Sequence, residues 1–87
     1  MLTEFPLDVV EAAWARARGH CECRRKSHGP PMRCNKQLVW KNRGRGTGRG
    51  CWEANHVNSN RPGSLSNCEI LCWECHKGTR SFGLHRR

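Results

Sequence analysis

Closely spaced cysteines are the residues of this 87-residue chain that point most directly to chemistry. Cys72 and Cys75 form a C-x2-C pair, the spacing that lets two thiolates bind one tetrahedral Zn²⁺. A second pair must come from elsewhere, and Cys34 can supply one of its thiolates. The other comes from Cys21 or Cys23. We favour Cys21 because it directly follows a predicted helix end, and Cys23 remains the alternative. The cysteines therefore predict a structural zinc site.

The remaining cysteines, and one histidine, point to metal less directly. Cys51 and Cys68 have no partner at ligand spacing, which favours small buried thiols. His28 lies between Cys23 and Cys34 and could join Cys23 in an alternative or second site.

Histidines and asparagines in the last third of the chain could form a second centre. His76 follows Cys75 on a predicted helix, where adjacent residues diverge by about 100°, so we expect it to face outward toward another site. His56 ends a predicted strand, with Asn55 before it and Asn67 eleven residues later. One neutral imidazole can take a proton from water while a second binds a divalent cation at a phosphate. Such a group could hydrolyse a phosphodiester. The alternative is two surface histidines and two turn asparagines.

The charge of the chain indicates a polyanionic partner. With 16 Lys+Arg and 7 Asp+Glu the formal net charge is +9, and four thiolates with one Zn²⁺ would change it to 9 − 4 + 2 = +7. Residues 41–50 alternate glycine with arginine and have no apolar side chain to bury, so we expect a mobile loop that follows a phosphate chain or, alternatively, a solvated linker. The candidate DNA contacts are Arg43, Arg45, Arg49, Lys77 and Arg80.

Size and composition explain why a metal would be needed. A chain of this length buries only about 60–65% of its unfolded surface, and 36% hydrophobic residues with nine glycines build a small core.

The N-terminal residues lack the basic leader and apolar core of a signal peptide, and no apolar run approaches about 18 residues. We therefore expect a cytoplasmic protein with no membrane segment, whose close cysteines bind metal in a reducing compartment.

The elements that position these residues form one predicted domain, 1–87, of a small α+β class. An amphipathic helix is expected in 1–19, starting near Pro6 and ending at Gly19. A zinc knuckle loop at 20–36, a short strand at 38–40 and the Arg/Gly-rich loop at 41–50 follow.

The segment 51–82 holds the proposed chemistry. Strands are predicted at 52–57 and 67–72, followed by a short helix from 73 to about 79. Alternation along the second strand places its cysteines on one face and Asn67 on the other.

The order EANHV followed by LSNCEILCWECHKGT resembles the HNH endonucleases of homing and phage type. Their motif places His, Asn and His on a ββα-metal hairpin, with a CxxC directly before the last His. Asn67 and His76 are separated by eight residues, as in that motif, and the CxxCH at 72–76 matches it residue for residue. The resemblance covers 51–82 and extends more loosely to the first zinc pair, which an inserted loop widens.

The resemblance implies a treble-clef-like ββα-metal domain that cleaves DNA with a divalent metal. His56 matches the general base, His76 a ligand of the catalytic Mg²⁺ or Mn²⁺, and Asn67 the residue that holds the base in position. The family commonly has Asp or His as a second metal ligand before the first His, and Asn55 stands there in this chain. A neutral amide offers less charge, so metal affinity should be lower unless Glu53 or a substrate phosphate compensates.

Two functions of different class follow. The first is a nuclease that nicks DNA with low sequence specificity, because the only long helix is committed to packing. The second is a catalytically weak or inactive, zinc-stapled nucleic-acid-binding module. Strict alternation separates Asn55 from His56, so a shared site requires the strand to twist or end there. Family members of this size are often phage-encoded and act beside DNA-packaging proteins, so the resemblance also implies a larger protein partner.

Overall fold

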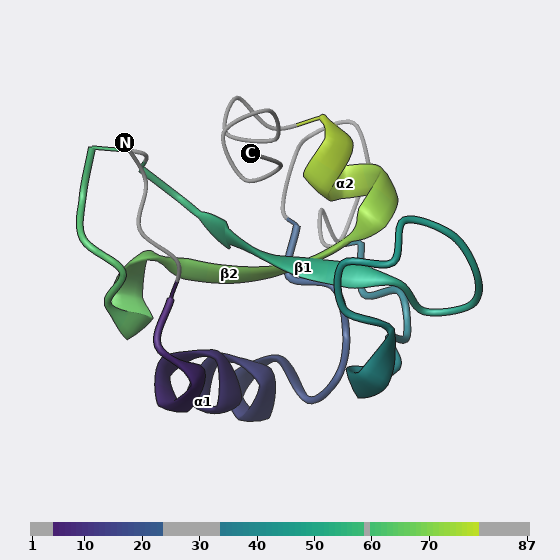
Figure 1. Cartoon of the computed structure of the whole chain (residues 1–87), viewed down its shortest axis with the longest axis horizontal. Coiled ribbons are helices and arrows are strands. Elements are labelled where there is room, and N and C mark those ends of the chain that lie inside the picture. Colours follow the sequence, from purple (N-terminus) through teal and green to yellow (C-terminus); the bar gives the residue numbers. More distant parts are fainter. Residues whose placement is uncertain (1–4, 24–33, 59, 79–87) are drawn as a thin grey trace.

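Two helices lie on opposite faces of a two-stranded antiparallel sheet (Figure 1). The computed structural model describes residues 5–23, 34–58 and 60–78. The fold is a small, compact α+β arrangement, and none of its described helices has the length and apolar character needed to cross a bilayer. The elements in chain order are α1 (Leu7–Ala17), η2 (Trp40–Asn42), β1 (Trp52–His56), η3 (Leu65–Asn67), β2 (Cys68–Cys72) and α2 (Trp73–Lys77).

The predicted first helix, α1, is confirmed and begins directly after a proline. The carbonyl of Pro6 accepts the N–H groups of Val9 and Val10, and proline suits this end because its missing N–H would have no partner in the helix. The helix ends where Arg18 (φ 56°) and Gly19 (φ 70°) adopt left-handed backbone, which reverses the chain. Its buried stripe consists of Val10, Ala13 and Ala17.

The strand register decides which side chains share a face of the sheet. Directly opposite residues of an antiparallel pair lie on the same face. Trp52 of β1 contacts Trp14 of α1, with ring centroids 4.7 Å apart, so alternate residues from Trp52 to His56 face α1. Asn55, paired with Glu69, lies on the face that α2 covers.

The predicted second-half elements are confirmed with shorter ends. β1 ends at His56. The Val57 N–H then donates to the carbonyl of Asn67 at 3.0 Å, at the start of the loop that leads back to β2. Asn67 belongs to the 3₁₀ turn η3 and not to β2. The predicted end of the last helix at 79 lies outside the described residues.

The short strand predicted at 38–40 is wrong. The Leu38 N–H donates to the carbonyl of Gly19 at 2.8 Å, and the Val39 N–H donates to that of Gly50 at 3.0 Å. The segment therefore bonds to a different loop on each side. Among residues 5–23, 34–58 and 60–78 no strand lies beside it to extend the pairing, and the segment continues into η2.

An acidic residue between two cysteines joins the knuckle to the edge of β2. The Glu22 N–H donates to the carbonyl of Ile70 at 2.7 Å, and the Ile70 N–H donates to the Glu22 carboxylate at 2.9 Å. Arg16 of α1 holds the same carboxylate through two bonds of 2.7 and 2.8 Å and also donates to the carbonyl of Cys68. These bonds fix the cysteine-bearing segment against both α1 and the sheet.

Candidate functional site

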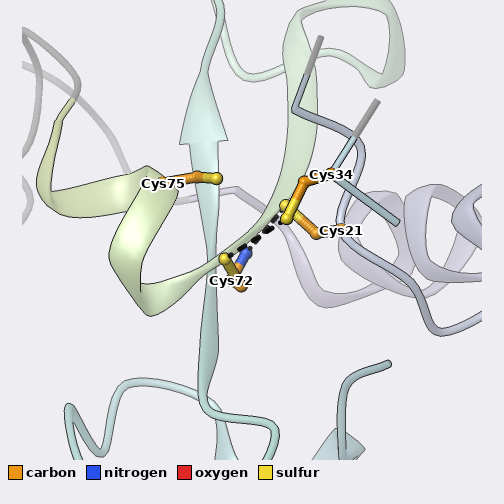
Figure 2. A group of neighbouring side chains, drawn as sticks. All are labelled: Cys21, Cys34, Cys72 and Cys75. Atoms are coloured by element: carbon orange, nitrogen blue, oxygen red, sulfur yellow. Dashed lines mark hydrogen bonds between the residues drawn. The ribbon is translucent and has the colours of Figure 1, made fainter. Parts of the chain in front are cut away.

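Four cysteines from three segments of the chain converge on one point (Figure 2). The sulfur atoms of Cys21, Cys34, Cys72 and Cys75 all lie within 4.8 Å of one another, and those of Cys34 and Cys72 are 3.9 Å apart. Four sulfurs at about 2.3 Å from a tetrahedral zinc ion would be about 3.8 Å apart, so a small contraction suffices. These four cysteines could hold a structural metal such as zinc, and they are the set favoured from the sequence.

The backbone around the cluster aims the thiols. Cys72 ends β2 and Cys75 lies in α2, so the strand-to-helix junction turns both toward the knuckle. The Cys72 N–H donates to the sulfur of Cys21 at 3.2 Å, which orients the Cys21 side chain toward the cluster. The Cys21 N–H in turn donates to the carbonyl of Lys36 at 2.9 Å, which holds the two arms of the knuckle together.

Before a metal binds, the cluster shares protons among its thiols. The hydrogen bond from the Cys21 thiol lowers the pKa of Cys72 to about 5, and the same bond raises the pKa of Cys21. Burial raises the pKa of Cys75. Since zinc binds thiolates, binding near neutral pH must release protons from Cys21 and Cys75.

Cys23, the alternative ligand, lies beside this group but is not a member of it. Its side chain is buried, and its carbonyl accepts the N–H of Cys34 at 2.8 Å. Its thiol is close enough to Cys75 to contribute to the raised pKa of that residue. His28, named as a possible partner of Cys23, lies outside the described residues.

The two cysteines without a ligand partner differ from each other. Cys68 is buried, and burial raises the pKa of its thiol to about 11, as expected for an inert core residue. Cys51 is only half-buried and lines a cavity at the start of β1.

The two candidate catalytic histidines are buried, which excludes the surface-histidine alternative. His56 is 3% exposed and His76 is 1% exposed. The expectation that His76 faces outward is wrong. The helix α2 lies on the sheet, so a side chain of this helix can point away from the cysteines and still be buried. The His76 ring packs against Trp73 with ring centroids 5.3 Å apart.

Phe5 covers the ring of His56. The two rings stack with centroids 4.0 Å apart and an angle of 23° between their planes. Gly63 closes the other side of Phe5, where a Cβ atom would lie 3.2 Å from the phenyl ring. Regular pairing continues to the end of β1, so His56 faces α1 while Asn55 faces α2. The structure therefore does not bring these two residues to one face.

Asn67 fastens the loop that follows His56. Its side-chain oxygen accepts the Asn58 N–H at 2.8 Å. Its amide nitrogen donates to the carbonyls of Asn58, Arg61 and Pro62 at 3.0, 3.2 and 3.0 Å. One buried amide thus ties both ends of the loop to the start of β2.

Glu53, which could have compensated for the neutral amide of Asn55, is bound elsewhere. Its carboxylate accepts hydrogen bonds from Arg43 at 2.5 Å and from the Ala54 N–H at 2.8 Å. The carboxylate that the register places opposite Asn55 is Glu69. Alternation along β2 was the signal that could have identified it.

The candidate DNA-contacting residues differ in their surroundings. Arg43 pairs with Glu53, and its guanidinium also lies 5.6 Å from the centre of the Trp52 ring. Arg45 and Arg49 are exposed on a loop that we expected to be mobile. That loop is closed by a 2.7 Å bond from the Asn42 side chain to the Arg49 carbonyl. Lys77 is exposed and pairs with Glu74 at 3.1 Å, and Arg80 lies outside the described residues.

Comparison with known proteins identifies no similar protein. The chain matches no family model, no curated protein and no solved structure. The assignment of function therefore depends on the residues and on their geometry.

Two residues that shape these sites were missed from the sequence. An apolar residue directly before a helix start commonly packs back on the first turn, and this rule could have drawn attention to Phe5. Glu22 had a weaker signal, as a lone acid between two cysteines in a basic segment. Its bonds to Arg16 are local, but its bond to the Ile70 N–H at the edge of β2 spans 48 positions, which no local pattern predicts.

Proposed function

We propose that this protein is a metal-dependent endonuclease of the HNH type, which nicks DNA with low sequence specificity. The observation that carries the proposal is the Asn67 clamp on the loop after His56, since the resemblance assigns an orienting asparagine to this position. The order of β1, β2 and α2 is also that of a ββα-metal unit, and the four cysteines could fasten its helix to the knuckle.

In this proposal His56 takes the proton of the attacking water as a neutral imidazole. Asn55 lies on the face covered by α2, the helix that carries His76, so these two residues suit one metal site, with Glu69 opposite Asn55. A Mg²⁺ or Mn²⁺ ion bound there would stabilise charge on the phosphate and on the leaving 3′ oxygen. The net charge of +9 favours the DNA backbone as partner.

Catalysis requires two changes at His56. Phe5 must leave the imidazole ring, which is 3% exposed, before a phosphate can approach. The end of β1 must also twist, so that His56 and Asn55 serve the same phosphate. These two features favour the second candidate function, a zinc-stapled nucleic-acid-binding module that does not turn over.

Relaxation of supercoiled plasmid by the zinc-loaded protein separates the two functions. We expect nicking that depends on added Mg²⁺ or Mn²⁺. His56→Ala should reduce it by about 100-fold or more, since a general base contributes about 10²–10⁴-fold. His20→Ala is the matched control, because His20 is half-buried outside the proposed site and bonds to the carbonyl of Arg18.

A third variant tests whether Phe5 shields the base. Phe5→Ala should raise the nicking rate if access to His56 is limiting. Nicking that survives in folded His56→Ala would overturn the role of this residue. Retardation of DNA without nicking by any variant would favour the binding module.

A further inference from the structure

A cavity of about 380 Å³ lies at the end of the sheet away from His56. Its walls come from the Arg/Gly-rich loop, from the start of α2 and from the segment that follows Cys34. The residues that decide its chemistry are Lys36, Gly46, Thr47, Gly48, Trp73 and Glu74.

One wall of the cavity consists of backbone amides. Gly46 and Gly48 have φ angles of 77° and 95°, so every second residue here adopts a conformation that suits glycine. Within the described part of the chain, the amides of Gly46, Thr47 and Gly48 donate no hydrogen bond to the protein. Successive N–H groups in such turns form concave anion sites.

The backbone of this wall is accessible at Gly48 and packs on a tryptophan ring at Gly46. A Cβ atom added to Gly48 would meet nothing within 4 Å, so the backbone there is accessible. A Cβ atom on Gly46 would lie 3.3 Å from the indole of Trp73, so this glycine rests on the ring. The loop is also tied at its ends, by the Gly44 N–H to the carbonyl of Trp52 and by the Asn42 side chain to that of Arg49. A tied loop keeps its amides in place before a ligand arrives.

The side chains around the cavity favour an anion. Lys36 lines it and is exposed, and Thr47 adds a hydroxyl donor. The carboxylate in its lining, Glu74, forms an ion pair with Lys77 at 3.1 Å, which offsets its charge. Cys72 also lines the cavity, but it is buried and its sulfur belongs to the four-cysteine group. The neighbouring Arg45 and Arg49 are exposed on the same loop.

We propose that this cavity, the phosphate pocket, binds a phosphate group of the nucleic-acid backbone. Its donors are the Lys36 ammonium, the Thr47 hydroxyl and the amides of residues 46–48. Only the source of the phosphate rests on the proposed function, because the donors would suit any phosphate. β1 separates the pocket from His56 by four residue steps, about 13 Å.

Two lysine variants test the proposal with equal changes of charge. The experiment measures binding of the zinc-loaded protein to a 20-base-pair DNA duplex at several salt concentrations, with no Mg²⁺ or Mn²⁺. Lys36→Ala should weaken binding about tenfold and reduce the salt slope by about 1. Lys41→Ala, which removes an exposed lysine of η2 outside the pocket lining, should have a clearly smaller effect. Glu74→Gln should tighten binding about twofold. Equal effects of the two lysine variants would overturn the proposal.

Inorganic phosphate tests the pocket independently of DNA. In ¹H–¹⁵N spectra of the zinc-loaded protein, phosphate should shift the amide resonances of Gly46, Thr47 and Gly48, and Lys36→Ala should abolish these shifts. Failure to shift them would overturn the pocket. If phosphate shifts them but the DNA duplex does not, the nucleic-acid source is wrong. Loss of nicking alone would count against the nuclease and not against the pocket, since neither binding experiment requires cleavage.

Discussion

The two ends of the sheet differ in how fully the structure assembles the predicted sites. At the cysteine end, the four sulfurs expected from spacing lie within 4.8 Å of one another. At the histidine end, Asn55 and His56 face opposite sides of β1, and Phe5 covers the His56 ring. A C-x2-C at a strand-to-helix junction converges through ordinary local geometry. Two adjacent strand residues can share a site only where the strand departs from regular alternation.

The two ends are also held by different forces. The buried core formed by the described residues is small, so a metal that binds four side chains from separate segments could supply much of the stability. The histidine end is held by hydrogen bonds and ring packing, chiefly the bonds of the Asn67 amide, the Phe5–His56 stack and the bond from Arg16 to the Cys68 carbonyl. We therefore expect substitutions at the cysteine end to affect the whole fold, and those at the histidine end to act more locally.

The largest expected effect follows from removing one cluster thiol. Cys72→Ser should abolish cooperative unfolding, because structural zinc contributes roughly 10–16 kcal/mol in small metal-dependent domains. Thermal unfolding followed by circular dichroism measures this, with Cys51→Ser as the control thiol outside the cluster. A metal-free protein that melts cooperatively at the wild-type temperature would show that the cysteines do not staple the fold.

A second pair of variants sharpens the choice between neighbouring thiols. Cys21→Ser should reduce zinc affinity at least 100-fold, because it removes a member of the four-sulfur group. Cys23→Ser should retain zinc and reduce stability by about 1–2 kcal/mol through burial of a hydroxyl. The intensity of the Co²⁺–thiolate absorption in each variant reports the number of sulfur ligands. Four sulfurs in Cys21→Ser would mean that Cys23 can take its place.

The same contrast explains what could be predicted from the sequence. The helix up to Gly19, the strand pair and the four-cysteine set were accessible because each depends on local periodicity, capping or spacing. The packing of Phe5 on His56 was not, because it joins residues 51 positions apart. The failed strand at 38–40 shows the same limit, since a strand exists only where a neighbour pairs with it.

Asn67→Ala tests the histidine end of the sheet, and we expect it to lower the free energy of unfolding by less than loss of the zinc site does. The change leaves several loop groups without their hydrogen-bond partner, so the free energy of unfolding should fall by about 2–4 kcal/mol. Asn42→Ala is the matched control, because the one bond its side chain makes to Arg49 should cost about 1 kcal/mol. Chemical denaturation of the zinc-loaded variants measures both. Equal losses would mean that Asn67 does not hold the loop more firmly than an ordinary surface amide does.

The smallest expected effect would show whether the α2 face of the histidine end binds a metal at all. Asn55→Asp places a second carboxylate opposite Glu69, so without a divalent metal the like charges should destabilise the fold by about 1 kcal/mol. Mn²⁺ would relieve this repulsion, and its affinity should rise about tenfold because a carboxylate is a stronger ligand than an amide. Calorimetric titration of Mn²⁺ into the zinc-loaded protein, with Asn58→Asp in the following loop as control, measures the gain. An unchanged Mn²⁺ affinity would exclude Asn55 as a ligand, and the metal site at this end would have to be assigned without it.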